Sequence, residues 1–222
     1  RYSSIYALTY RFLYGVTGMT TKAVHSQTTD NSAAVVGSRS LRVRRVITPR
    51  AGGFSTGRYH GLNLSLDVGD NPVTVAHNRE RLAEKLHLPL ERFVYMEQLQ
   101  SPHVSVIEAT ADTRFTAPIP ATDAVVTTAP ELALVVLTAD AVPVLLGDDE
   151  AGVIAALHGS LFGIRAGLIA NTVDAMQQLD ADPHRMHALL GPSATGRNMR
   201  VSEAVAADME NRVPHTLSLI HI

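Results

Sequence analysis

Short, continuous apolar runs are the feature that most constrains how this chain can fold. Residues Ala133–Thr138, Val142–Leu146 and Val153–Leu157 form runs of five or six residues that hold almost no polar side chain. A strand with one face in water alternates polar and apolar residues, whereas a strand covered on both faces does not. The runs therefore predict a sheet that is buried between other layers.

Further strands are predicted at Leu41–Thr48, Phe93–Met96 and Val104–Glu108. In the first of these, arginines interleave with leucine and valine. This pattern is typical of a half-buried strand and not of a phosphate-binding patch. The formal net charge of -2 likewise gives no reason to expect nucleic acid or an anionic membrane as a partner.

Two helices are predicted between the strands. The first begins at Asn71-Pro72, because asparagine is a good helix cap and proline suits the first helical position. The second is predicted from about Ile164 to Leu179, where apolar residues recur at helical spacing. Strands and helices are interspersed without strict alternation, and 222 residues suit one sizeable domain. We therefore expect a single layered α+β domain with mixed β-sheets flanked by helices.

Both ends of the chain look foreign to this domain. We interpret residues 1–40 as a disordered or non-native leader, with Met19 as the true start, and residues 41–216 as the domain, incomplete at its C-terminus. Residues 217–222 read Leu-Ser-Leu-Ile-His-Ile, which is what a common sequencing adapter encodes, and we interpret them as an artefact. The alternative is a genuine apolar terminal strand.

The chain contains no cysteine. This excludes disulfides, zinc sites built on thiolate, and blue-copper sites, whose defining ligand is a cysteine sulfur. No apolar run reaches the roughly 20 residues that a membrane-spanning helix needs. Together these two features make the cytoplasm the expected location. No feature of the sequence assigns an oligomeric state.

A glycine-rich loop opens the most informative part of the chain. Residues Arg50–Gly57 hold three glycines within six positions, which indicates a tight loop. Several short blocks follow it in order: Leu62-Asn63-Leu64, Val68–Pro72, Asn78-Arg79, Gln98, Ala121–Thr127, Leu137–Asp140, Pro143–Leu146, Ala156-Leu157-His158 and Gly191-Pro192. In this order and spacing the blocks resemble the YfiH-like family, also known as laccase-domain proteins, over most of residues 45–201.

The resemblance implies an enzyme that acts on purine nucleosides and phosphate. Phosphorolysis of adenosine, inosine and methylthioadenosine is attributed to the family, together with adenosine deamination. Some members carry an older label of copper-dependent polyphenol oxidase. The family's metal centre, which holds zinc or copper, uses two histidines and one cysteine.

The three metal-ligand positions correspond here to Gln100, Ala141 and His158, so only the last keeps a family ligand. Catalytic zinc normally needs three protein ligands. A glutamine amide oxygen is a poor substitute for imidazole, and an alanine methyl group has no lone pair. We therefore expect zinc or copper binding to be weak or absent. An oxygen-rich site of His158, Asp140 and Asp123 is conceivable, but it suits zinc less well.

The catalytic candidates are His158 and Asp140. His158 is either a retained ligand or general acid–base, or a packed histidine at the end of a strand. Asp140 either takes part in catalysis or caps the turn that follows it. Arg165 is a conceivable replacement for a family arginine whose position is occupied here by Phe162.

The substrate-binding candidates are Arg50, Asn63, Gln98 and Asp123. The guanidinium of Arg50 suits a phosphate or ribose contact, because guanidinium binds oxyanions through two hydrogen bonds. Its alternative role is a salt bridge that braces the loop. Asn63 and Gln98 either orient a nucleoside or satisfy loop backbone. Asp123 matches a family carboxylate.

Three functions compete. The first is a purine nucleoside phosphorylase that is impaired by the loss of metal ligands. The second is a catalytically inactive pseudoenzyme that keeps the fold to bind a ligand or a partner, and the missing ligands favour it. The third, a multicopper oxidase, is the weakest, because such proteins need cysteine and several His-x-His clusters, which the sequence lacks.

Overall fold

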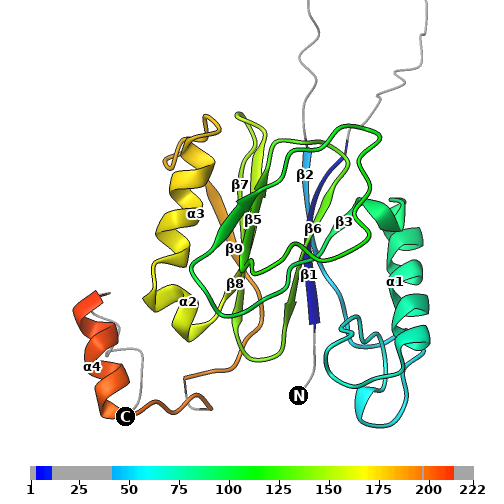
Figure 1. The fold of residues 1–222 in the computed structure, drawn as a ribbon, viewed down its shortest axis with the longest axis horizontal. Helices are drawn as coiled ribbons and strands as arrows, with labels where there is room; N and C mark the ends of the chain where they lie inside the picture. The colour runs from blue at the N-terminus through cyan, green and yellow to red at the C-terminus, as the bar shows by residue number, and fades with distance from the viewer. Residues whose placement is uncertain (1–3, 12–41, 197, 213–222) are drawn as a thin grey trace, which may run out of the picture.

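The structure is a computed structural model that describes residues 4–11, 42–196 and 198–212. Two β-sheets lie face to face between helices (Figure 1). The helix α3 (Leu168–Gln177) covers the outer face of one sheet, and α1 (Pro72–Leu86) covers the outer face of the other. The expected α+β architecture with mixed sheets flanked by helices is confirmed.

The smaller sheet has four strands in the order β2-β1-β6-β3. The pairs β1·β2 and β1·β6 are antiparallel, and β3·β6 is parallel. The strands are β1 (Ser4–Arg11), β2 (Arg42–Ile47), β3 (Phe93–Val94) and β6 (Ala133–Thr138).

The larger sheet has five strands in the order β4-β5-β8-β7-β9. Its pairs are antiparallel except for β4·β5, which is parallel. The strands are β4 (Val104–Val106), β5 (Ala124–Thr127), β7 (Val142–Asp148), β8 (Val153–Gly159) and β9 (His187–Leu190).

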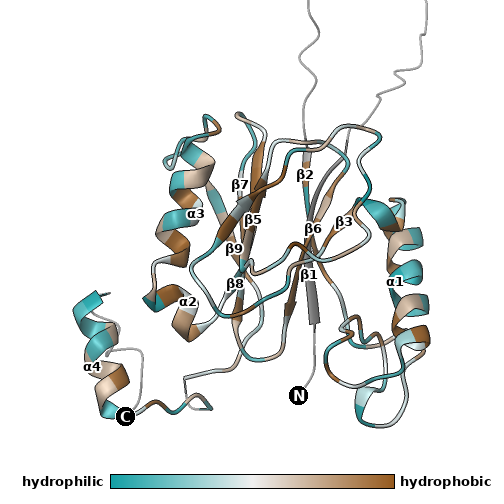
Figure 2. Cartoon of the chain, in the orientation of Figure 1, coloured by the Kyte–Doolittle hydropathy of each residue, from teal (hydrophilic) through white to brown (hydrophobic). Residues whose placement is uncertain are grey.

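The apolar runs fill three stacked core layers. In β6, Leu134 and Val136 point into the layer between the sheets, whereas Val135 points into the layer beneath α1. In β8, Ile154 likewise faces the other sheet, and Leu157 faces α3. Side chains alternate across a strand, so a strand with a core on each side is apolar at every position. Figure 2 shows hydrophobic residues along β5, β6 and β8, whereas α1 and α3 also carry hydrophilic residues.

The first helix follows its prediction. The Asn71 side chain accepts a hydrogen bond from the backbone N–H of Val73 at 2.9 Å, and Pro72 is the first helical residue. The prediction of one helix over 164–179 is wrong. The structure has α2 (Leu161–Arg165) and α3, separated by Gly167, whose φ of 98° lies in the left-handed region. A residue in that conformation ends a helix, and glycine adopts it without steric cost.

Several elements lie outside the predicted ones: β1, β5, β9, α4 (Glu203–Arg212) and the two 3-10 turns Gly57–Tyr59 and Leu90–Arg92. Of these, β1 falls within residues 1–40, for which a leader was predicted, and it pairs with both β2 and β6. The remainder of residues 1–40 and residues 213–222 lie outside the described part of the chain. The interpretations of Met19 as the start and of 217–222 as an artefact stay predictions. In the described residues, no helix is long and apolar enough to cross a membrane.

A buried carboxylate at the C-terminal end of β7 links this strand to the segments that follow it. The side chain of Asp148 is fully buried and accepts hydrogen bonds from the backbone N–H groups of Glu150, Ala151 and Asp182 and from Arg185. Burial raises the pKa of Asp148, but the hydrogen bonds from Arg185 and from the backbone outweigh it and hold the pKa well below its usual range.

We expect Asp148→Asn to lower the free energy of unfolding at pH 7 by about 2 kcal/mol, a modest value because Arg185 is partly screened by solvent. Since the folded-state pKa is depressed, this stabilisation is present above about pH 4 and is lost as the pH falls below it. Urea denaturation at pH 7 and pH 3 should therefore show the difference from wild type shrinking at the lower pH. The variant Asp149→Asn at the exposed neighbouring residue should leave the free energy of unfolding unchanged at both pH values. An equal loss in both variants would contradict a stabilising role for the Asp148 carboxylate.

Candidate functional site

The candidate site lies where β8 ends. His158 occupies the penultimate position of β8 and pairs with Pro143 of β7. The next residue is Gly159, and a Cβ atom there would lie 2.5 Å from the carbonyl oxygen of Val142. Only glycine allows the two strands to approach this closely, so the local sequence is fitted to hold His158 at a tight junction.

Strand register brings Asp123 to His158. The pairing of β5 with β8 sets Ala124 opposite Leu157, and the backbone N–H of His158 donates to the Asp123 carbonyl at 2.8 Å. The side chains then meet, with 2.9 Å between His158 Nδ1 and Asp123 Oδ1. A shift of one residue in this register would turn the two side chains to opposite faces of the sheet.

Asp123 is held as a carboxylate by several donors. Its side chain is fully buried and accepts hydrogen bonds from the backbone N–H groups of Leu99, Gln100 and Ser101 and from the Ser101 hydroxyl. Burial raises the pKa of Asp123, but these hydrogen bonds and the one from His158 lower it below the usual range. An ionised carboxylate only accepts hydrogen bonds, so Nδ1 of His158 carries the proton.

The consequence is a fixed tautomer for His158. With Nδ1 donating to Asp123, the neutral ring presents Nε2 as a free acceptor, and no described residue makes a hydrogen bond to Nε2. The His158 side chain is 12% exposed, so the ring is largely buried but can be reached. This arrangement can exchange one proton with a bound molecule, or it can offer one nitrogen to a metal ion.

The loop that carries Gln100 is fixed by its backbone. Gln100 itself has φ of 59°, in the left-handed region, and its side chain is exposed. The Asn171 side chain donates to the carbonyl of Pro102 at 3.0 Å, and Gly163 lets α2 approach the carbonyl of Ser101. The path of the loop therefore depends on groups other than the Gln100 side chain.

Gln98 is engaged with the neighbouring strand. Its Nε2 donates to the carbonyl of Leu137 at 2.6 Å, and its Oε1 accepts from the N–H of Leu137 at 2.9 Å. The amide group of Gln98 therefore pairs with both backbone polar groups of Leu137 in β6, as a neighbouring strand would. These two hydrogen bonds join the loop at Gln98 to the end of β6, and a substrate-binding role for Gln98 stays a prediction.

The glycine-rich loop lies in a different layer. Leu62 and Leu64, which follow it, pack in the core beneath α1, on the opposite side of the smaller sheet from β8 (Figure 1). Asn63 is buried and hydrogen bonds to Ser65 and to the carboxylate of Asp70. Arg50 donates from Nε to the carbonyl of His60 at 3.0 Å across the loop. Both side chains take part in the structure of the loop.

Asp140 and Ala141 lie in the turn before β7. Asp140 is exposed, and its carbonyl accepts a hydrogen bond from Ala194. The carbonyl of Ala141 accepts one from the Thr138 hydroxyl at 2.6 Å. Arg165, the conceivable replacement for the family arginine, forms an ion pair with Asp208 on α4. Its charge is therefore balanced within the chain.

The side chains present do not fit a three-ligand metal centre. Within the described part of the chain, no group of three or more histidine, cysteine, aspartate or glutamate side chains is placed to hold a metal ion. The conceivable set of His158, Asp140 and Asp123 is thus not assembled. The Asp123 carboxylate already accepts five hydrogen bonds from the protein. Of the two side chains in this pair, only His158 has an atom, Nε2, that is free to bind a metal ion.

The structure also identifies two serines that the sequence did not single out. Ser101 hydrogen bonds to Asp123 at 2.8 Å, and the Ser160 side chain caps α2 by accepting from the N–H of Gly163 at 3.0 Å. Ser160 had a local signal, since serine three residues before the bonded N–H is typical of a helix cap. Ser101 had none, because its partner is distant in sequence.

Comparison of the sequence with known protein families gives one match over most of the chain. Residues 44–221 match the family model described as multi-copper polyphenol oxidoreductase laccase. The chain belongs to this family. Strand β1 lies outside the matched residues, and His158, Asp123, Gln100 and Ala141 lie within them.

Curated relatives carry the name purine nucleoside phosphorylase. One from Corynebacterium glutamicum is 49% identical over 181 residues, which are 81% of this chain and 72% of the relative. One from Streptomyces griseus is 43% identical over 189 residues, which are 84% of this chain and 74% of the relative. The description of the family model indicates a metal cofactor across the family, whereas the described residues of this chain contain no group of three side chains placed to hold a metal ion.

Solved structures agree on the fold. The crystal structure of YlmD from Geobacillus stearothermophilus matches with a TM-score of 0.70 and 28% identity over 75% of this chain. YfiH from Bacillus licheniformis matches with a TM-score of 0.68 and 27% identity, also over 75% of this chain. The match spans 64% of the length of each of these two structures. The resemblance to the YfiH-like family is confirmed.

We expect Asp123→Ala to lower the free energy of unfolding by about 3 kcal/mol, because it leaves several buried N–H groups and the His158 ring without an acceptor. Thermal or urea denaturation measures the loss. The exposed Asp112→Ala is the matched control and should behave like wild type. A stability of Asp123→Ala within 0.5 kcal/mol of wild type, on the scale of ordinary surface changes, would show that the carboxylate does not hold the loop.

The paired reversion Gln100→His and Ala141→Cys should restore zinc binding. It adds an imidazole and a thiolate beside His158, which gives the three ligands that catalytic zinc requires. Histidine also tolerates the left-handed backbone at position 100 better than most residues. Metal analysis after dialysis should find about one zinc per revertant chain. No zinc uptake would mean that positions 100 and 141 do not face His158.

Proposed function

We propose that this chain binds a purine nucleoside and phosphate beside His158 and carries out a slow, metal-independent phosphorolysis. The observation that carries the proposal is the Asp123–His158 pair, which keeps a proton-transfer group in a fixed tautomer although two metal-ligand positions have changed. The relatives' names supply the substrate class. The chain spans only part of the length of these relatives, so the activity and the substrates of the whole protein are also proposals.

The reaction needs one nucleophile and one proton donor. A phosphate oxygen supplies the electron pair that forms the new bond to the ribose anomeric carbon, while the bond from that carbon to the purine nitrogen breaks. His158 Nε2, the free acceptor of the ring, takes a proton from the incoming dihydrogen phosphate and passes it to the leaving purine, which departs as a neutral base. Asp123 stabilises the doubly protonated ring through Nδ1, so the pair works as a general acid.

The remaining candidates receive separate roles in this proposal. Asp140, exposed in the turn before β7, is the second catalytic candidate, because its carboxylate is free to approach the ribose. Arg50 and Asn63, the other substrate-binding candidates, lie in a different layer from His158, so this proposal gives them a role in the structure of the glycine-rich loop and not a substrate contact. Gln98 and Asp123 act by positioning the loop and the ring, which follows from the hydrogen bonds they make.

Metal chemistry is not part of the proposed reaction. A single imidazole nitrogen does not hold zinc or copper at useful affinity, and the described donors provide no more. Adenosine deamination depends on metal-activated hydroxide, so we expect it to be lost or very slow.

The second candidate function is a pseudoenzyme that binds a nucleoside without turning it over. Gln100 and Ala141 favour it, because these two positions offer no chemistry of their own. The hydrogen bonds between Asp123 and residues 99–101 would then serve to hold the loop and the His158 ring in place.

An assay of the full chain distinguishes the phosphorylase from the pseudoenzyme. It measures the phosphate-dependent release of base from inosine or adenosine. The first proposal expects measurable release without zinc, a fall of about 100-fold or more in His158→Asn, and no change in the exposed control His184→Asn. Saturable nucleoside binding by calorimetry without any release of base would establish the pseudoenzyme instead. Neither binding nor release would contradict both functions.

A further inference from the structure

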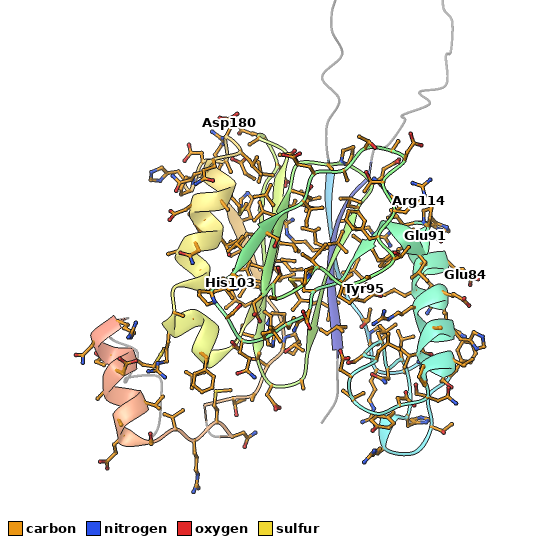
Figure 3. The ribbon with its side chains drawn as sticks, viewed as in Figure 1. Glu84, Glu91, Tyr95, His103, Arg114 and Asp180 are labelled. Atoms are coloured by element: carbon orange, nitrogen blue, oxygen red, sulfur yellow. The ribbon has the colours of Figure 1, made fainter. Side chains whose placement is uncertain are left out.

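A cavity lies on the opposite side of the molecule from His158. Its volume is about 260 Å³, and it is lined by residues of α1, the segment around β3 and the loop 115–118. Figure 3 shows Tyr95 and Glu91 on the side of α1, whereas His103, from the loop that carries Gln100, lies on the other side of the sheets. The cavity is therefore separate from the candidate site described above.

Arg79 provides a fixed cation in this cavity. Its Nε donates to the carbonyl of Leu64 at 2.9 Å, and its guanidinium carbon lies 4.0 Å from the centre of the Tyr95 ring. Burial raises the pKa of Tyr95 to about 12, so the ring beneath the cation stays neutral. Among the described residues no carboxylate pairs with Arg79, and its two terminal nitrogens make no hydrogen bond. They are free to bind an oxyanion.

Glu91 provides a carboxylate in the same cavity. Its backbone carbonyl accepts from the N–H of Phe115 at 2.8 Å, which fixes the residue against the loop 115–118. The Glu91 side chain is exposed and forms no ion pair with any described residue, including Arg79. The lining of the cavity thus includes one positive and one negative residue, and no ion pair joins them.

The walls between these charges are mostly aromatic and apolar. Phe93 is buried, Tyr95 and Phe115 add two more rings, and Leu90 and Pro118 complete the lining. Such walls favour a flat apolar body. The volume is below the roughly 300 Å³ at which cavities for drug-sized ligands begin, so the ligand must be compact.

We propose that this cavity binds a compact aromatic zwitterion, of the size and chemistry of a free aromatic amino acid. The carboxylate of the ligand pairs with Arg79, its ammonium group pairs with Glu91, and its ring packs on Phe93 and Phe115. A nucleoside does not match this pattern, because it has no charge to pair with either group. The site is therefore independent of the proposed phosphorolysis.

Calorimetry on the full chain with L-phenylalanine tests the proposal. We expect saturable binding with one ligand per chain. The two half-matched probes should bind at least tenfold more weakly: 3-phenylpropionate, which lacks the ammonium group, and 2-phenylethylamine, which lacks the carboxylate. Absence of saturable L-phenylalanine binding, or equal affinity for all three probes, would overturn the proposal.

Two variants connect the binding to the cavity. Glu91→Gln removes one charge at nearly constant volume and should weaken L-phenylalanine binding at least tenfold while leaving 3-phenylpropionate unchanged. Ala117→Trp fills the cavity from an exposed loop and should abolish binding of every probe. The exposed Glu84→Gln on α1 is the control and should match wild type.

Each variant is first compared with wild type by its melting temperature and circular dichroism, which confirm that it folds. L-Phenylalanine binding that survives unchanged in folded Glu91→Gln and folded Ala117→Trp would place the ligand elsewhere and contradict the proposal. Phosphorolysis is assayed separately, so failure of either proposal can be told from failure of the other.

Discussion

The constraint on which the rest of the structure depends is that both sheets are covered on both faces. A core lies between the sheets, a second beneath α1 and a third beneath α3. Strands β6 and β8 each contribute to two of these layers, so a polar substitution at almost any of their positions would bury an unsatisfied group. Because the interior strands are rigid, the loops at their ends can hold polar groups at defined positions.

The candidate site uses this rigidity. Its central pair comes from the end of β8 and from the residue just before β5, and both are placed by the same ladder of backbone hydrogen bonds. The chemistry available there is that of one oriented imidazole with a buried carboxylate behind it. Such a pair is suited to proton transfer, and catalytic zinc would need two further protein ligands beside His158.

The sequence predicted those parts of the fold that have a local cause. The continuous apolar runs predicted the buried strands β6, β7 and β8, and the Asn71 side chain with Pro72 predicted the start of α1. The break at Gly167 was missed, because apolar spacing continues through it while the backbone turns into the left-handed region. The edge strand β9 is largely exposed and carries no clear alternation, so no pattern marked it.

The site was only partly accessible to the same reasoning. Its individual residues could be named from motifs, but the contact between Asp123 and His158 depends on the register of two strands that are 35 residues apart at this point. No local pattern encodes such a register. For the same reason the hydrogen bonds that join the Gln98 side chain to Leu137 of β6 could not be predicted from the sequence.

Asp123 contacts the loop through main-chain atoms, and this has an evolutionary consequence. The N–H groups of residues 99, 100 and 101 are present whatever side chains stand there, so the carboxylate keeps its partners when position 100 changes. The path of this loop is thereby uncoupled from the identity of the side chain at position 100. Substitutions at position 100 can therefore accumulate during evolution while the contact between Asp123 and His158 is kept.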